Sequence, residues 1–150
     1  MDKPVSGAAA GLVSGMTVGI ISMALYMFGI CNLCLVAIGG GLFNRAIVPP
    51  VLSVQNIAGW AAHLTLGMIL GILFIYILYF TGRDFALLKG ALFGTAVWYV
   101  AIGLVLPVSG MIPGNANTAD IMILLAYHLL FGLLTAALLV RYAKLETIKR

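Results

Sequence analysis

Charged residues are scarce in this sequence, and their scarcity excludes most soluble classes of protein. Only 8% of the 150 residues are Asp, Glu, Lys or Arg, whereas 63% are hydrophobic. The mean hydropathy is +1.18. A soluble domain needs roughly a quarter of its residues charged to cover its surface. The composition therefore excludes a soluble globular enzyme and a disordered chain, and it predicts a protein whose solvent is the lipid bilayer.

Several motifs of catalysis are also missing. No phosphate-binding loop, dinucleotide fingerprint, H-E-x-x-H or G-x-S-x-G occurs. The two cysteines, Cys31 and Cys34, are too few for a four-sulfur zinc or iron–sulfur site. Their C-x-x-C spacing leaves two interpretations open, a redox pair that forms a disulfide or two small apolar side chains that fill space. No catalytic residue is assigned, and a protein that is not an enzyme is expected.

Four apolar runs are long enough to cross a bilayer, which takes about 20 residues of helix. Crossings are predicted at about residues 6–30, 57–80, 86–107 and 119–141. Proline, glycine and asparagine separate these runs. The sequence therefore predicts an all-α integral membrane protein. It has one transmembrane domain, residues 1–150, folded as a four-helix bundle.

Residues 31–43 do not fit this count of crossings. The uncharged stretch 5–43 is too long for one crossing and slightly too short for two crossings with a turn. A half-length segment is predicted after the first helix, either lying at the interface or dipping back into the protein. A long, tilted first helix is the alternative.

Basic residues predict the orientation. With four crossings, Arg45 stands alone on one side, and seven basic residues share the other: Lys3, Arg83, Lys89, Arg141, Lys144, Lys149 and Arg150. This asymmetry predicts a multi-pass protein of the cytoplasmic (inner) membrane of a prokaryote, N-in and C-in. The net charge of +4 then reflects this rule and attraction to anionic lipid. No nucleic-acid partner is expected.

Two short motifs recur in the same order. G-A-x-x-G occurs at Gly7–Gly11 and again at Gly90–Gly94, and H-L-x-x-G occurs at His63–Gly67 and again at His128–Gly132. The order predicts two helical hairpins related by an axis along the membrane normal. Chance coincidence of common membrane residues is the alternative.

The sole histidines, His63 and His128, both fall inside predicted crossings. They lie about 9 and 10 Å from the same membrane edge, so the two imidazoles are expected to be level and to face each other. An ionisable residue inside a membrane is a functional-site hypothesis by default. Gly67 and Gly132 share a helix face with these histidines and would let a flat ring lie against the backbone.

Several ligands suit such a pair of imidazoles. Haem b would take both as iron ligands, a quinone head group would hydrogen-bond to them, and a metal ion would need further ligands. With either haem or quinone bound, the protein would serve electron transfer or would be a small subunit of a respiratory assembly. Against haem, the same edge offers only Arg45 for the propionates, and Asp120 would repel them. A structural accessory subunit with no cofactor, whose histidines are interhelical polar contacts, is the alternative. A small oligomeric transporter or channel is the third functional interpretation.

Small residues predict close helix packing. Glycine recurs every fourth residue at Gly7, Gly11, Gly15 and Gly19, and briefly at Gly90 and Gly94. Such a face lets another helix approach closely. The partner is either within the chain, or another membrane subunit or a second copy. Asp120 is expected to cap the fourth helix and to pair with Arg45.

With these residues in hand, the chain resembles uncharacterised four-helix prokaryotic membrane proteins of a domain-of-unknown-function family. The shared pattern is a glycine-rich first helix, here Gly7 to Gly19, followed by H-x-x-x-G in the second and fourth helices. Here those motifs are His63–Gly67 and His128–Gly132. The resemblance spans most of the chain. It implies the four-helix architecture and brings no activity with it.

Overall fold

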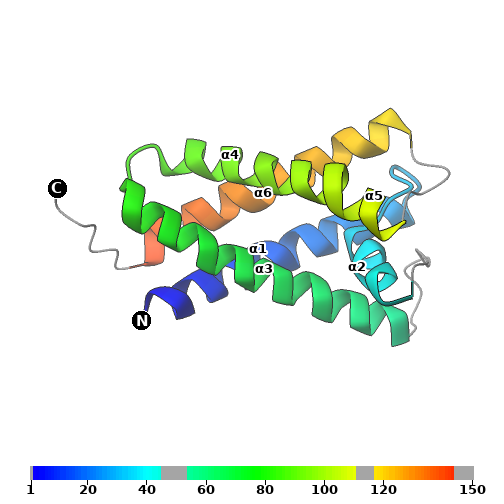
Figure 1. The fold of residues 1–150 in the computed structure, drawn as a ribbon, viewed down its shortest axis with the longest axis horizontal. Helices are drawn as coiled ribbons and strands as arrows, with labels where there is room; N and C mark the ends of the chain where they lie inside the picture. Colours follow the sequence, from blue (N-terminus) through cyan, green and yellow to red (C-terminus); the bar gives the residue numbers. More distant parts are fainter. Residues whose placement is uncertain (1, 45–53, 111–116, 144–150) are drawn as a thin grey trace.

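Long helices make up the computed structural model, which describes residues 2–44, 54–110 and 117–143 (Figure 1). The long helices are α1 (Lys3–Met27), α3 (Val54–Thr81), α4 (Ala86–Val100), which continues through η1 (Ala101–Val105) into α5 (Leu106–Ser109), and α6 (Thr118–Tyr142). These form four spans that are long and apolar enough to cross a membrane. The prediction of an all-α, four-helix membrane protein is confirmed.

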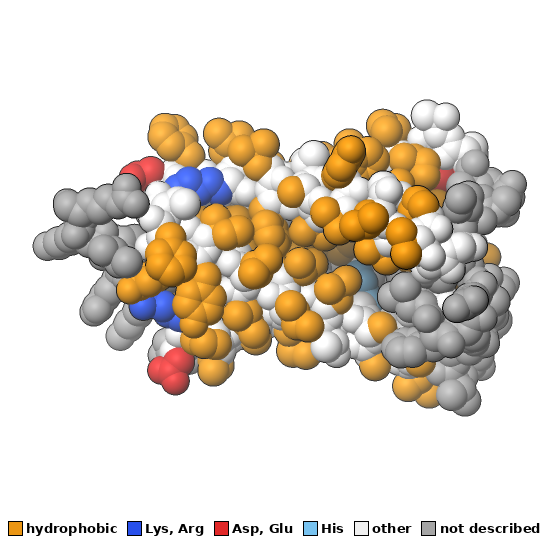
Figure 2. All heavy atoms as spheres, viewed as in Figure 1, with side chains coloured by type: hydrophobic (Ala, Val, Ile, Leu, Met, Phe, Trp, Pro, Cys, Tyr) orange, Lys and Arg blue, Asp and Glu red, His pale blue; other side chains and the backbone are white. Residues whose placement is uncertain are grey.

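Apolar side chains cover much of the face of the bundle that Figure 2 shows. Leu66, Ile69 and Leu73 on α3, and Leu88 and Leu92 on α4, each expose more than half of their surface. A soluble monomer rarely exposes a continuous apolar surface of this extent. The outer surface is therefore suited to contact with lipid chains.

The start of α1, the α3–α4 loop and the end of α6 lie at one end of the bundle (Figure 1). Two basic side chains at this end bond to helix C-termini. The Lys89 ammonium donates to the carbonyl oxygens of Thr81 and Gly82, at 3.0 and 2.9 Å, and the Arg83 guanidinium donates to that of Val140. Cations are favourable there because the last carbonyls of a helix have no partner within it.

The first crossing lies closer to the N-terminus than residues 6–30. α1 begins at Lys3 and ends at Met27. Gly29 follows with φ +69°, its N–H bonds to the carbonyl oxygen of Tyr26, and the N–H of Ile30 bonds to that of Leu25, both at 3.0 Å. This pair of bonds is a Schellman motif, which needs a left-handed residue that glycine adopts without strain. Gly29 therefore ends the helix before residue 30.

The half-length segment is present as α2 (Leu35–Asn44), so the first helix is not one long, tilted crossing. α2 packs against the first half of α3. A Cβ on Gly59 would overlap the carbonyl oxygen of Val36, and one on Gly39 would lie 3.0 Å from that of Gly59. Cys34 and Val36 are fully buried. Two glycines thus allow a short helix to fold back inside the bundle.

Two hairpins make up the rest of the fold, as the repeat predicted. In the first, α1 meets α3 where Gly11 faces Gly67, and in the second, α4 meets α6 where Gly90 faces Gly132. At each crossing, an added Cβ would collide with the opposite backbone.

The register of the repeat differs by one helical turn from the G-A-x-x-G match. That match paired Gly7 with Gly90. In the structure Gly11 is the counterpart of Gly90, because each meets the glycine of an H-L-x-x-G motif. Gly7 instead meets Gly71, whose carbonyl oxygen is 2.8 Å from an added Cβ. Equivalent glycines in the two hairpins are therefore identified by their contact with the facing backbone and not by the local sequence motif.

Candidate functional site

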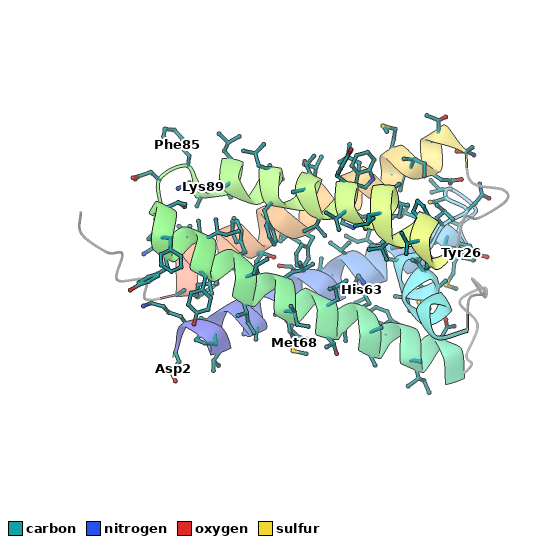
Figure 3. The ribbon with its side chains drawn as sticks, viewed as in Figure 1. Asp2, Tyr26, His63, Met68, Phe85 and Lys89 are labelled. Atoms are coloured by element: carbon teal, nitrogen blue, oxygen red, sulfur yellow. The ribbon has the colours of Figure 1, made fainter. Side chains whose placement is uncertain are left out.

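Both histidines line one cavity, whose volume is about 290 Å³, at the place where the two hairpins meet α2. Its other walls are largely apolar and include Val18, Leu70, Ile102, Leu124 and Phe131. Figure 2 shows a hollow between α3 and α4 in which a histidine is visible, and Figure 3 places His63 there. The structure therefore brings together the two residues that the sequence singled out.

His63 makes an interhelical contact. Its Nε2 lies 2.9 Å from the carbonyl oxygen of Gly15 on α1. A carbonyl oxygen only accepts, so Nε2 carries the proton and donates, which leaves Nδ1 as a lone-pair acceptor. The ring of Trp60, one turn earlier on α3, stands edge-on to the imidazole with centroids 6.2 Å apart. His63 thus fastens α3 to α1 while one nitrogen stays unused.

His128 forms its hydrogen bond through the other ring nitrogen. Its Nδ1 lies 2.7 Å from the carbonyl oxygen of Leu124, one turn earlier on the same helix. Nδ1 is therefore the donor and Nε2 is the acceptor. Among the described residues, neither His128 Nε2 nor His63 Nδ1 takes part in a hydrogen bond. The cavity is thus lined by two imidazoles that each retain one free lone pair.

The two glycines that follow the histidines have different surroundings. Gly67 lines the cavity and also faces Gly11. Gly132 is not among the lining residues, and its Cα faces Gly90. Of these two glycines, only Gly67 contributes backbone to the cavity wall against which a flat ring could rest. At Gly132 that space is taken by α4.

The glycines assigned to helix packing meet helices of the same chain. Gly7, Gly11 and Gly19 face α3, and Gly90 and Gly94 face α6. Gly15 is looser: an added Cβ would have its nearest contact at 3.8 Å. Its carbonyl oxygen, which accepts from His63, is what that position contributes to the site.

A π-helical turn, Ala101–Val105, forms part of the cavity wall. It ends two residues before Pro107, which has no N–H to continue the α-helical hydrogen bonding. The crossing was predicted to end at this proline. Instead, one turn of the helix adopts the wider π-helical geometry and the helix continues to Ser109. Gly110, with φ +70°, then ends it. Proline within an apolar run was the available signal, and π-turns of this kind are frequent at functional sites.

The described residues contain no group of three or more His, Cys, Asp or Glu side chains placed to hold a metal ion. The two imidazoles could supply two ligands. A bare ion needs more than these, whereas a haem iron brings four nitrogens from its own ring.

Asp120 joins the α1–α2 loop to the start of α6. Its carboxylate is 1% exposed. It accepts from the backbone N–H and the side-chain amide of Asn32, at 2.9 and 3.1 Å, and from the backbone N–H of Asn117, at 3.1 Å. Asn117 in turn caps the N–H of Asp120, which completes a capping box. Asp120 thus takes part in capping α6 as expected, although the N-cap residue itself is Asn117. Arg45, its predicted partner, lies outside the described residues.

Replacing Asp120 with asparagine is expected to lower the free energy of unfolding by about 2 kcal/mol. The change keeps the size of the side chain but turns one oxygen into an NH₂ group that faces other donors. Thermal unfolding in detergent measures the loss. Asp84→Asn is the control, because Asp84 is exposed. Equal melting temperatures for the two variants would contradict the role given to Asp120.

Cys31 and Cys34 are free thiols, both buried. Burial raises the pKa of the Cys31 thiol above its usual value, and the nearby Asp120 carboxylate adds to the rise. Because the thiolate is the reactive form, we expect alkylation at pH 8 to be at least about ten times slower in the folded protein than in the unfolded chain. A Cys34→Ala variant isolates Cys31 for this measurement. Equal rates would show that the thiol is accessible and ionised.

Comparison with known proteins gives one family and no activity. The model of a family described as "Family of unknown function (DUF6789)" matches residues 1–149. No curated protein and no solved structure matches the chain. What the protein does must therefore be inferred from its own cavity.

Proposed function

Because the chain belongs to the DUF6789 family, whose description assigns no activity, we propose a function from the cavity itself. The protein binds a lipid-soluble ring of the quinone class between His63 and His128. It serves electron transfer in the membrane or is a small subunit of a respiratory assembly. The observation that carries this proposal is that both intramembrane histidines line one apolar cavity.

The opening of the cavity supports a ligand that arrives through the lipid. Figure 2 shows the hollow on the lateral surface between α3 and α4, with apolar side chains around it. Quinones dissolve in the hydrocarbon layer because of their apolar tails. A lateral opening of this kind would admit a head group while the tail stays among lipid chains.

The size of the cavity favours a single ring over haem. Ligand pockets commonly measure about 300–1,000 Å³, so about 290 Å³ is at the lower limit. A benzoquinone head group suits this volume, whereas a porphyrin would need the walls to move apart. Haem b stays the second candidate, because a lone pair on each imidazole is what axial ligation of iron requires.

The structural alternative explains only one of the histidines. The bond from His63 to Gly15 is an interhelical polar contact of the kind an accessory subunit would use. The hydrogen bond of His128 stays within α6, so it does not join helices. A purely structural role therefore does not explain the second imidazole or the cavity beside it.

The placement of charge supports the N-in, C-in orientation as part of the proposal. The described basic residues Lys3, Arg83, Lys89 and Arg141 belong to segments at one end of the bundle, the end at which α1 starts and α6 finishes. The positive-inside rule assigns this end to the cytoplasm. The cytoplasmic membrane of a prokaryote is the membrane we propose.

Purification in mild detergent, with an affinity tag that contains no histidine, tests the proposal. The absorption spectrum is recorded before and after dithionite, and bound molecules are extracted with organic solvent. We expect an extractable quinone or quinol, in smaller amount from His128→Leu, and no haem band. A reduced-minus-oxidised haem band would make the protein a cytochrome. The absence of both, after expression with adequate haem and quinone, would leave the structural role.

A further inference from the structure

We infer that the cavity selects the reduced, dihydroxy form of its ring ligand, a quinol, over the oxidised quinone. This inference rests on the proposed function, because it specifies which form the same site holds. The observation behind it is the pair of free nitrogens, His63 Nδ1 and His128 Nε2.

The hydrogen bonds of the two histidines decide which groups they offer to a ligand. Each neutral imidazole has one donor and one acceptor. The donor of His63 is held by the carbonyl oxygen of Gly15, and that of His128 by the carbonyl oxygen of Leu124. Both bonds stay within the protein. The acceptors are therefore what a ligand meets.

The backbone keeps this arrangement in place. The Leu124 carbonyl lies one turn before His128 on its own helix, so the bond needs no movement of other helices. The Gly15 carbonyl is brought to His63 by the close crossing of α1 and α3 at Gly11 and Gly67. Reversing either tautomer would leave a carbonyl oxygen opposite a lone pair in a low-dielectric interior, which is costly.

A quinol and a quinone differ in what they bring to these two acceptors. A quinol carries two hydroxyl groups, and each can donate to one imidazole. A quinone carries two carbonyl oxygens, which only accept and would face lone pairs. The rest of the lining that the structure describes is hydrocarbon apart from Tyr127, whose hydroxyl oxygen is buried and has almost no accessible surface, so the quinone meets no strong donor there. A net hydrogen bond of about 1.4 kcal/mol corresponds to a factor of about ten in affinity.

Three probes that share one trimethylated ring test the inference on the purified protein. They are trimethyl-1,4-benzoquinol under anaerobic conditions, the corresponding quinone, and the 1,4-dimethyl ether of the quinol. The dissociation constant of each is measured by titration calorimetry. We expect the quinol to bind at least about ten times more tightly than the quinone, and the ether to bind as weakly as the quinone because it has no donor.

A variant links the preference to the imidazole. His128→Leu should lower the affinity for the quinol about tenfold and the affinity for the quinone by clearly less, because the quinone makes no hydrogen bond to this imidazole. Thr65→Val, at an exposed position on α3, is the control and should change neither. A His128→Leu variant that weakens all three probes equally would contradict selection by hydrogen bonding.

The outcomes with the unaltered protein need no variant and separate the two claims. If none of the probes binds, the proposed function fails. If the quinone binds as tightly as the quinol, or more tightly, the site exists and the inference about the reduced form is wrong. Preference for the quinol over both other probes supports the inference.

Discussion

Replacing Gly11 with valine is expected to lower the free energy of unfolding by about 3 kcal/mol or more, or to leave no folded protein in detergent. A Cβ at this position would overlap the carbonyl oxygen of Gly67 and lie 2.9 Å from its carbonyl carbon. Backbone cannot turn away as a flexible side chain can. α1 and α3 would therefore have to separate along the whole crossing, with loss of packing and of the bond from His63 to Gly15.

Gly103→Ala is the matched control for this change. An added Cβ at Gly103 meets nothing within 4 Å, so the alanine should be tolerated. Size-exclusion chromatography and thermal unfolding measure both variants. If Gly11→Val elutes and melts as Gly103→Ala does, then the close approach of α1 and α3 is not what holds the first hairpin together.

Replacing either histidine with alanine is expected to weaken quinol binding about tenfold, because each imidazole accepts one of the two hydroxyl hydrogen bonds. The two variants should nevertheless differ in stability. His63→Ala also removes the bond to Gly15 on α1, which costs about 1 kcal/mol. His128→Ala removes only a bond within α6, so its melting temperature should stay closer to that of the unaltered protein. Ligand retained per chain and thermal unfolding are the two measurements.

A different outcome would rule out the two-imidazole site. If only one of the two substitutions weakens binding, the other histidine does not hold the ligand, and the two-imidazole site is wrong. If neither substitution weakens binding, the ligand is bound elsewhere.

The four crossings and the two hairpins were predictable because lipid imposes a simple rule. A helix must satisfy its own backbone in hydrocarbon, so long apolar runs become helices whatever their other details. The ends of these helices were harder to place. Gly29 and Pro107 act through local backbone geometry, a Schellman turn and a π-turn, and hydropathy does not record either.

The histidines were found from the sequence because ionisable residues within a membrane are rare and costly. Their roles were not, since these depend on which carbonyl oxygen each ring nitrogen meets. Gly132 shows the same limit. Its spacing from His128 matches that of Gly67 from His63, yet its Cα packs against Gly90, because helix contact and ligand contact produce the same pattern of glycine.

Nitrogen NMR of protein labelled with ¹⁵N only in histidine tests whether two neutral imidazoles offer acceptors to the ligand. The chain has two histidines, so each signal can be assigned from a single variant. We expect His63 to be protonated at Nε2 and His128 at Nδ1. Added trimethyl-1,4-benzoquinol should shift the unprotonated nitrogen of both rings. Identical tautomers, or nitrogen signals that do not respond to the quinol, would contradict this expectation.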